Sequence, residues 1–235
     1  MKQFLVSLLL VVFCVACADK AENTMLVNGS VKGLKKGVLY LQKVSDTTLV
    51  TIDSLVVKGS GDFKFSTTVE SPQIFYLYLK KEDNNDMNDR ITFFGEPGTI
   101  SIQTSWNDFE KKALIEGSET QKKLEEYSKV ISRFNTQSIE QLQASVNPEL
   151  VKDPNAIDSL QKAYEKNILR SYLYALNFAL NNTESHIAPY IALKDVADAN
   201  VKYLDSIYNS LSPEVANGTY GLALKKHLSE VKEKE

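Results

Sequence analysis

Two patterns of hydrophobic and polar positions follow one another along this chain. From Met25 to about Glu116, apolar residues recur at every second position, as in "FKFSTTV" (63–69) and "TISIQT" (99–104). A period of two is typical of strands with one buried face. Several short strands separated by turn residues favour an antiparallel β-sandwich or an open barrel. We therefore predict a β domain over residues 25–116.

Two further features refine this prediction. The run "IFYLYL" is apolar at consecutive positions, which indicates a central strand covered on both faces over Ile74 to Leu79. Turns are expected where glycine, proline and asparagine gather. These places are Asn28-Gly29, Lys36-Gly37, Gly59 to Asp62 and Glu96 to Gly98.

The aromatic residues of the β half allow two interpretations. Packing inside the sandwich is favoured, because large aromatic side chains are usually buried. An exposed aromatic strip that grips a peptide or a glycan is the alternative. The residues concerned are Tyr40, Phe75, Tyr76 and Tyr78.

From Ser118 onward the period changes to that of a helix. Ser118 and Gln121 resemble a capping box, and Asp153 with Pro154 is typical of a second helix start. Apolar stripes at spacings of three and four predict core-facing helices. The stripes cover residues 124–134, 157–180, 201–211 and 220–231. The fold class is therefore predicted as α+β, with a helical domain over residues 117–235.

The N-terminal residues form an apolar run too short to span a bilayer. Residues 4–16 carry no charge, whereas a membrane-spanning helix needs about 20 apolar residues. The run is typical of a secretory signal, and such signals end at small residues. Ala16 followed by Cys17 resembles the lipobox of bacterial lipoproteins, although Cys14 stands where that motif usually has leucine.

The lipobox resemblance implies a cleavable leader and a lipid anchor. Residues 1–16 would be removed, Cys17 would carry the lipid, and residues 17–24 would be a polar tether. Two or more acyl chains hold a protein stably on a membrane. The alternative is plain secretion with cleavage after Ala18, which the small residues also permit.

Composition excludes some classes of function. The chain has 27 Lys and Arg against 30 Asp and Glu, a net charge of −3, so no basic excess favours nucleic acid. Cys14 and Cys17 are its only cysteines. If Cys17 is acylated or removed, the mature chain can form no disulfide, and its core must hold the fold.

Residues suited to catalysis or metal binding are few, and none forms a recognised motif. Asp83 and Asn85 alternate as in a calcium loop, but no glycine follows, so a solvated hairpin loop over residues 80–90 is the favoured interpretation. His186 and His227 lack the spacing of zinc ligands. The sequence places no base beside Ser54, which follows Asp53. We predict no catalytic residue, metal or cofactor.

Three Asp-Ser-apolar triplets resemble an O-glycosylation acceptor of exported proteins in some Gram-negative anaerobes. They begin at Asp53, Asp158 and Asp205. Glycosylation is one hypothesis. The other is chance combined with structural use, since the third triplet lies within a predicted helix.

The order of the glycine-punctuated strands resembles the domain-of-unknown-function family DUF4369. The segments that carry the resemblance are "VNGSVKGLKKGVLYLQK", "TIDSLVVKGSGDFKF", "SPQIFYLYL", "GEPGTISI" and "IEGSETQKKLEEY". The helical half resembles the segment that usually follows this module, in "ESHIAPYIAL" and "LDSIYNSLSPEVANGTYGLALKKHLSE".

The resemblance implies a cell-envelope location. Such modules are common in Gram-negative lipoproteins, where they precede a thioredoxin-like, peroxiredoxin-type domain. Here the chain ends in "VKEKE" where that domain is expected, and Trp106 is followed by Asn-Asp-Phe rather than by a C-x-x-C motif. The thiol-disulfide chemistry of that domain needs an activated thiol. This chemistry is therefore not carried over to any residue of this chain.

Three functions are open at this level. The first is a non-catalytic binding or scaffolding lipoprotein of the outer membrane, facing the periplasm or the cell surface. The second is an accessory that docks a separate thioredoxin-like protein. The third is an enzyme with an unrecognised hydrolytic site, for which Asp53 and Asp83 would be the first residues to substitute.

Overall fold

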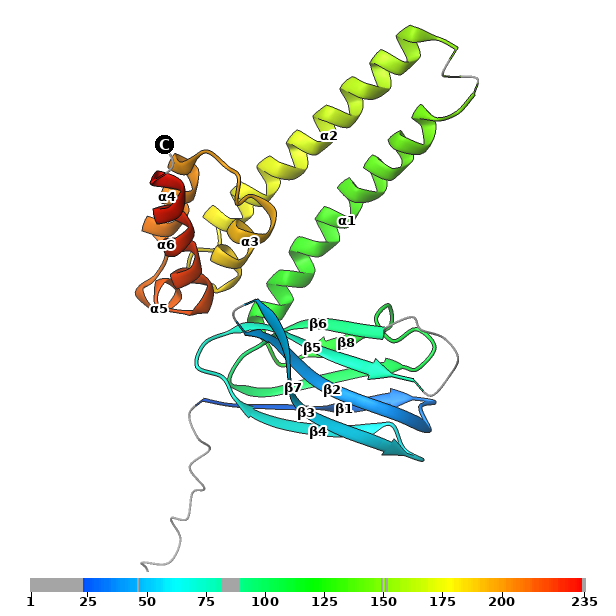
Figure 1. Cartoon of the computed structure of the whole chain (residues 1–235), viewed down its shortest axis with the longest axis vertical. Coiled ribbons are helices and arrows are strands. Elements are labelled where there is room, and N and C mark those ends of the chain that lie inside the picture. The colour runs from blue at the N-terminus through cyan, green and yellow to red at the C-terminus, as the bar shows by residue number, and fades with distance from the viewer. Residues whose placement is uncertain (1–22, 46, 82–88, 149, 151, 234–235) are drawn as a thin grey trace, which may run out of the picture.

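The protein is a β-sandwich joined to a helical body from which a long helical hairpin projects (Figure 1). The computed structural model describes residues 23–45, 47–81, 89–148, 150 and 152–233. The strands in these ranges are β1 (Thr24–Lys32), β2 (Lys36–Ser45), β3 (Thr48–Lys58), β4 (Asp62–Thr68), β5 (Gln73–Lys80), β6 (Asp89–Gly95), β7 (Gly98–Ser105) and β8 (Leu114–Glu116).

The strands form two four-stranded sheets, in the orders β4-β1-β7-β8 and β3-β2-β5-β6. This arrangement confirms the predicted α+β class and selects the sandwich over the open barrel. The antiparallel expectation is wrong for one pair, because β1 and β7 run parallel. The edge strands β8 and β6 both lie on the side of the sandwich where the first helix begins.

The period of two correctly marked the buried face of the strands. Phe63 and Phe65 of β4 and Ile100 and Ile102 of β7 all lie in the sandwich core, each at most 5% exposed. Turns also occur at Gly59 to Asp62 and at Glu96 to Gly98, as predicted.

The turn predicted at Asn28-Gly29 is wrong, because both residues lie inside β1. The glycine serves a close approach between neighbouring strands. A Cβ atom at Gly29 would stand 1.8 Å from the backbone oxygen of Ile102 in β7. Only glycine therefore fits this position beside the parallel partner strand.

Strand β5 has two differently covered faces, as predicted for a central strand. Phe75, Leu77 and Leu79 face the sandwich core, whereas Ile74 on the opposite face belongs to the helical core. The tyrosines do not pack inside the sandwich as we favoured. Tyr76 and Tyr78 lie on the outer face, half-buried.

The helices begin where the capping residues predict. They are α1 (Glu119–Ser145), α2 (Pro154–Leu180), α3 (Ile187–Asp195), α4 (Val201–Ser210), α5 (Pro213–Ala216) and α6 (Thr219–Lys232). The Ser118 side chain accepts a hydrogen bond from the Gln121 N–H at 2.9 Å. Asp153 accepts from the Asn155 N–H at 2.9 Å. Helix α3 has no predicted stripe, because it is buried nearly all round.

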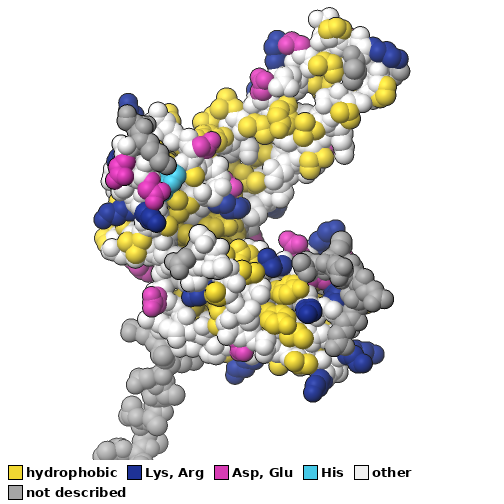
Figure 2. Space-filling view, in the orientation of Figure 1, with side chains coloured by type: hydrophobic (Ala, Val, Ile, Leu, Met, Phe, Trp, Pro, Cys, Tyr) yellow, Lys and Arg dark blue, Asp and Glu magenta, His cyan; other side chains and the backbone are white. Residues whose placement is uncertain are grey.

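Helices α1 and α2 form an arm that extends beyond the helical body (Figure 1). Asn167 joins the two helices by donating to the Phe134 carbonyl and to Ser138, each at 2.8 Å. The stripe over residues 157–180 is only partly core, because Ile168 on the arm is 46% exposed. Figure 2 shows hydrophobic side chains along this arm.

The sandwich and the helical body share a packed joint. Phe94 of β6 packs edge-on against Tyr190 and Tyr220, with ring centroids 5.3 and 6.0 Å away. The Tyr220 hydroxyl accepts a hydrogen bond from the Ile74 N–H at 3.0 Å. Apolar packing and a satisfied backbone donor thus hold the two parts in one orientation. None of the helices in the described ranges has the length and apolar character needed to cross a bilayer.

Candidate functional site

A groove of about 500 Å³ lies where the open side of the sandwich meets α1 and α3. Residues from β5, β6, the segment before β8, β8 itself, α1 and α3 line it. Volumes of this order are typical of ligand sites, which often occur where two structural units meet. We call this space the junction groove.

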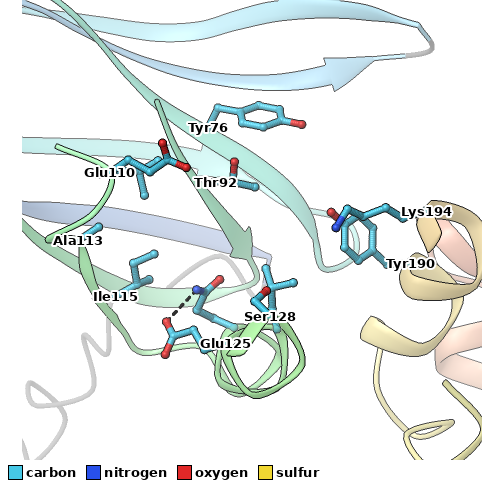
Figure 3. Close-up of a pocket in the computed structure, with 12 residues that line it drawn as sticks. Tyr76, Thr92, Glu110, Ala113, Ile115, Glu125, Ser128, Tyr190 and Lys194 are labelled. Atoms are coloured by element: carbon cyan, nitrogen blue, oxygen red, sulfur yellow. Dashed lines mark hydrogen bonds between the residues drawn. The ribbon is translucent and has the colours of Figure 1, made fainter. Parts of the chain in front are cut away.

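The sandwich side of the junction groove presents a strand edge and polar side chains. Thr92 lies on the edge strand β6 and is exposed, with Tyr76 of β5 beside it. Glu110 stands in the segment before β8 (Figure 3). The groove wall is therefore mixed in character, combining a tyrosine ring, a hydroxyl and a carboxylate.

Helix α3 supplies the opposite wall. Tyr190 and Lys194 project from it toward the sandwich (Figure 3). The Lys194 ammonium lies 3.6 Å from the Asp195 carboxylate and 5.8 Å from the centre of the Tyr190 ring. Burial is the main cause that raises the pKa of Tyr190, so its hydroxyl stays protonated at neutral pH.

The first turns of α1 form the floor of the junction groove. The Gln121 side-chain oxygen accepts a hydrogen bond from the Phe94 N–H at 2.9 Å. Its amide nitrogen donates to Glu125 at 2.9 Å, a contact drawn in Figure 3. Glu96 secures the same helix end by accepting from the Glu119 N–H and from the Thr120 hydroxyl, each at 2.8 Å.

An aromatic surface adjoins the groove on the outer face of the same sheet. The Arg90 guanidinium lies 5.4 Å from the ring centre of Tyr76 and 5.6 Å from that of Tyr78. Tyr40 stacks on Tyr78 with centroids 5.7 Å apart. Cation–π contacts of this kind hold an arginine over a ring. The three tyrosines thus form a half-buried strip on the outer face of the sheet, whereas Phe75 is buried at 1% exposure.

Several predicted site residues lie outside the described residues. They are Cys17 with the leader over 1–16, and Asp83 and Asn85 of the candidate calcium loop. The strands that flank this loop, β5 and β6, pair antiparallel. Among the described residues, no three His, Cys, Asp or Glu side chains gather closely enough to hold a metal ion.

The two histidines occupy unrelated environments. His186 precedes α3 and is 6% exposed, and neither of its ring nitrogens has a hydrogen-bond partner among the described residues. Burial is the main cause that lowers the pKa of His186, while the carboxylates of Glu214 and Glu96 act in the opposite sense. His227 is half-buried on α6, with its Nε2 atom 2.7 Å from the Ala197 carbonyl oxygen.

The Asp-Ser pair on β3 is a local contact. The Ser54 backbone N–H donates to the Asp53 carboxylate at 2.7 Å, and both residues are exposed. The serines of the other two triplets, Ser159 and Ser206, are exposed as well. All three hydroxyls therefore face solvent, the orientation that a modifying enzyme requires.

Of the residues that line the junction groove, Tyr76 and Gln121 were singled out from the sequence, as a possible aromatic strip and as a helix cap, whereas the charged residues were not. Glu110, Glu125 and Lys194 stand in otherwise ordinary polar positions, separated along the chain. No spacing rule connects them, because three different segments supply them.

The structure defines an α+β protein in which a β-sandwich carries a helical body and an open groove between them. The family model described as domain of unknown function (DUF4369) matches residues 25–124. This range holds nearly all of the sandwich and the start of α1, so the segment is a DUF4369 domain and the predicted resemblance is confirmed there. The helical segments quoted for the resemblance lie beyond the matched range. No curated protein matches the chain.

Proposed function

We propose that this protein is a non-catalytic binding lipoprotein of the cell envelope, and that the junction groove is its binding site. The observation that carries the proposal is the groove itself, which is open, about 500 Å³ in volume and lined from both parts of the molecule. The aromatic joint around Phe94 keeps the two walls in place. A preformed site avoids the cost of ordering its walls on binding.

The polar groups of the groove support binding rather than chemistry. Glu125 accepts a hydrogen bond from Gln121, and Lys194 is paired with Asp195. The protonated Tyr190 hydroxyl is a donor suited to orienting a ligand. These groups can fix a ligand by charge and hydrogen bonds without a proton transfer.

Membrane attachment is the second part of the proposal. It rests on the apolar run over residues 4–16 and on the small residue before Cys17. Lipid on Cys17 would anchor the chain to the outer membrane through the short segment before β1. The alternative role as an accessory of a thioredoxin-like protein stays a prediction, since no described residue favours it.

Site-specific photocrosslinking tests the binding role. A photoreactive phenylalanine analogue replaces Ser128, which is exposed on α1 in the junction groove. The full chain is produced in cells that export it, and adducts are identified by mass. We expect a defined adduct with an envelope component, because a ligand in the groove would contact this position.

Ser229 supplies the matched control for this experiment. It is an exposed helical serine on α6 outside the groove. The same analogue at Ser229 should give no such adduct. Equal labelling at both positions, or none at Ser128, would contradict the proposed site.

A further inference from the structure

The junction groove exposes the unpaired edge of a sheet. Strand β6 pairs with β5 and, within the described ranges, with no other strand. Peptide groups alternate between the two sides of a strand. The Phe94 N–H points away from β5, since its acceptor is Gln121. Thr92, two residues earlier, therefore directs its N–H and C=O into the groove.

The fold already places an amide on this edge. Gln121 accepts from the Phe94 N–H with its side-chain oxygen and donates with its nitrogen to Glu125. A primary amide offers the same acceptor and donor as a peptide group. Gln121 thus occupies the position that a pairing strand would take beside Phe94, and the next position, beside Thr92, is open to the groove.

The charges of the groove indicate which side chain such a strand would carry. Glu110 and Glu125 contribute two carboxylates to the lining, against one ammonium from Lys194. Lys194 is held by Asp195 and lies over the Tyr190 ring. A cationic side chain would complement the excess of carboxylate, and charge complementarity discriminates between partners.

We infer that the junction groove binds an extended peptide segment carrying a lysine or an arginine, which adds to β6 as a strand paired with Thr92. This inference rests on the proposed binding function and specifies its ligand. An added strand lies about 4.8 Å from its neighbour. Its main-chain hydrogen bonds to that neighbour provide affinity. The carboxylates of Glu110 and Glu125 receive the cation.

A peptide selection tests the inference directly. Random heptapeptides displayed on phage are selected on the full chain, purified in detergent and immobilised. Enriched peptides are synthesised, and their affinities are measured by fluorescence anisotropy. We expect lysine and arginine to be enriched, and the substitution Glu110→Gln to weaken binding of the selected peptides.

Backbone pairing is tested by two substitutions at one position. Thr92→Pro removes the N–H on the free edge, where proline is tolerated, whereas Thr92→Ala keeps it. We expect Thr92→Pro to weaken binding about tenfold, equivalent to about 1.4 kcal/mol, and Thr92→Ala to change it little. Thermal unfolding monitored by circular dichroism shows whether each variant is folded.

Modified peptides test the same pairing without any change to the protein. Each selected peptide is made in two versions, one with N-methyl groups at its odd-numbered backbone nitrogens and one at its even-numbered nitrogens. One version should lose about tenfold in affinity and the other little, because only one edge of an added strand faces β6.

Other outcomes overturn the inference. Equal binding by Thr92→Pro and Thr92→Ala, or by both methylated versions, would show that side chains alone mediate binding. Enrichment without cationic residues, or no enrichment, would also overturn it. If Ser128 still forms an envelope adduct in that case, the groove binds a ligand other than a strand, such as a glycan, and the proposed function stands.

Discussion

At the residue scale, His186 shows how burial controls a titratable group. Gly218 packs against its ring, and a Cβ atom there would stand 2.6 Å from the imidazole Cε1 atom. The carboxylate of the exposed Glu214 lies 4.0 Å from Nε2. The imidazole is therefore held in a tight space without a hydrogen-bond partner among the described residues. Such a site favours the neutral ring.

This environment predicts a loss of stability in mild acid. The pKa of His186 in the folded protein lies below its ordinary value of 6.5, chiefly because of burial. The unfolded chain therefore binds the proton first. The stabilisation is complete above pH 6.5 and is lost progressively as the pH falls from that value to the lower pKa of the folded protein. Urea unfolding at pH 7.5 and pH 5 measures the difference in the free energy of unfolding.

His186→Gln provides the comparison for this prediction. Glutamine does not titrate. The free energy of unfolding of the His186→Gln variant should therefore fall less between pH 7.5 and pH 5 than that of the unaltered chain. The difference between the two falls isolates His186 from the carboxylates that titrate in both proteins. An identical fall in both proteins would contradict the assigned role of His186.

At the element scale, the start of α1 fastens the helices to the sandwich. Ser118, the residue before α1, caps the helix with its side chain. Glu96, in the turn after β6, accepts two further hydrogen bonds from the first turn, and the Gln121 side-chain oxygen accepts one from the Phe94 N–H. In a capping box the third residue bonds back to the cap residue. Here the Gln121 side chain instead satisfies the edge of a sheet.

Removing the Gln121 amide should weaken this junction. Gln121→Ala leaves the buried Phe94 N–H without its acceptor, and an unsatisfied buried donor costs about 1–3 kcal/mol. We expect the free energy of unfolding in urea to fall by about that amount. Gln137→Ala is the control, because Gln137 is exposed on the same helix, and it should change stability little. Similar losses in both variants would contradict the junction role.

At the scale of the whole molecule, two cores are joined into one body. Ile74 and Phe94 come from the sandwich strands but belong to the helical core. The groove that we propose as the binding site lies beside this joint. A ligand in the groove would therefore contact both parts at once, while the α1–α2 arm stands away from the body (Figure 1).

The proposed anchor predicts a mature protein without a free thiol. The full chain is purified from membranes, treated with a maleimide under denaturing conditions, and weighed intact. We expect no maleimide adduct and a mass equal to residues 17–235 plus lipid, because Cys17 carries the acyl groups. The variant Ser229→Cys should take up one maleimide, which confirms that the reagent works. A reactive thiol at Cys17 would contradict lipidation, and a chain starting at residue 19 would indicate plain secretion.

Local features were predictable because neighbouring residues determine them. The period of two placed Phe63 and Phe65 on the buried face, and the side chains of Ser118 and Asp153 located the helix starts. The same reasoning failed at Gly29, since the close contact comes from Ile102 on a strand far along the chain.

The outer tyrosines show the same limit. Strand geometry puts Phe75 and Tyr76 on opposite faces, but the sequence grouped them together and could not say which face of the sheet the helices cover. That choice depends on the helical body, where Tyr220 reaches the Ile74 N–H across 146 residues of sequence. Whether the strand edge at Thr92 is open also depends on which strands pair.

The sequence by itself determined the two halves, their periods, the helix caps and the composition of the N-terminal run, because each depends on residues close together in the chain. Only the tertiary structure decided the parallel pairing of β1 with β7, the second role of Gln121 and the junction groove. These features arise where distant segments meet. Their physical basis is the competition among possible partners for the same backbone groups and apolar faces, which no local pattern records.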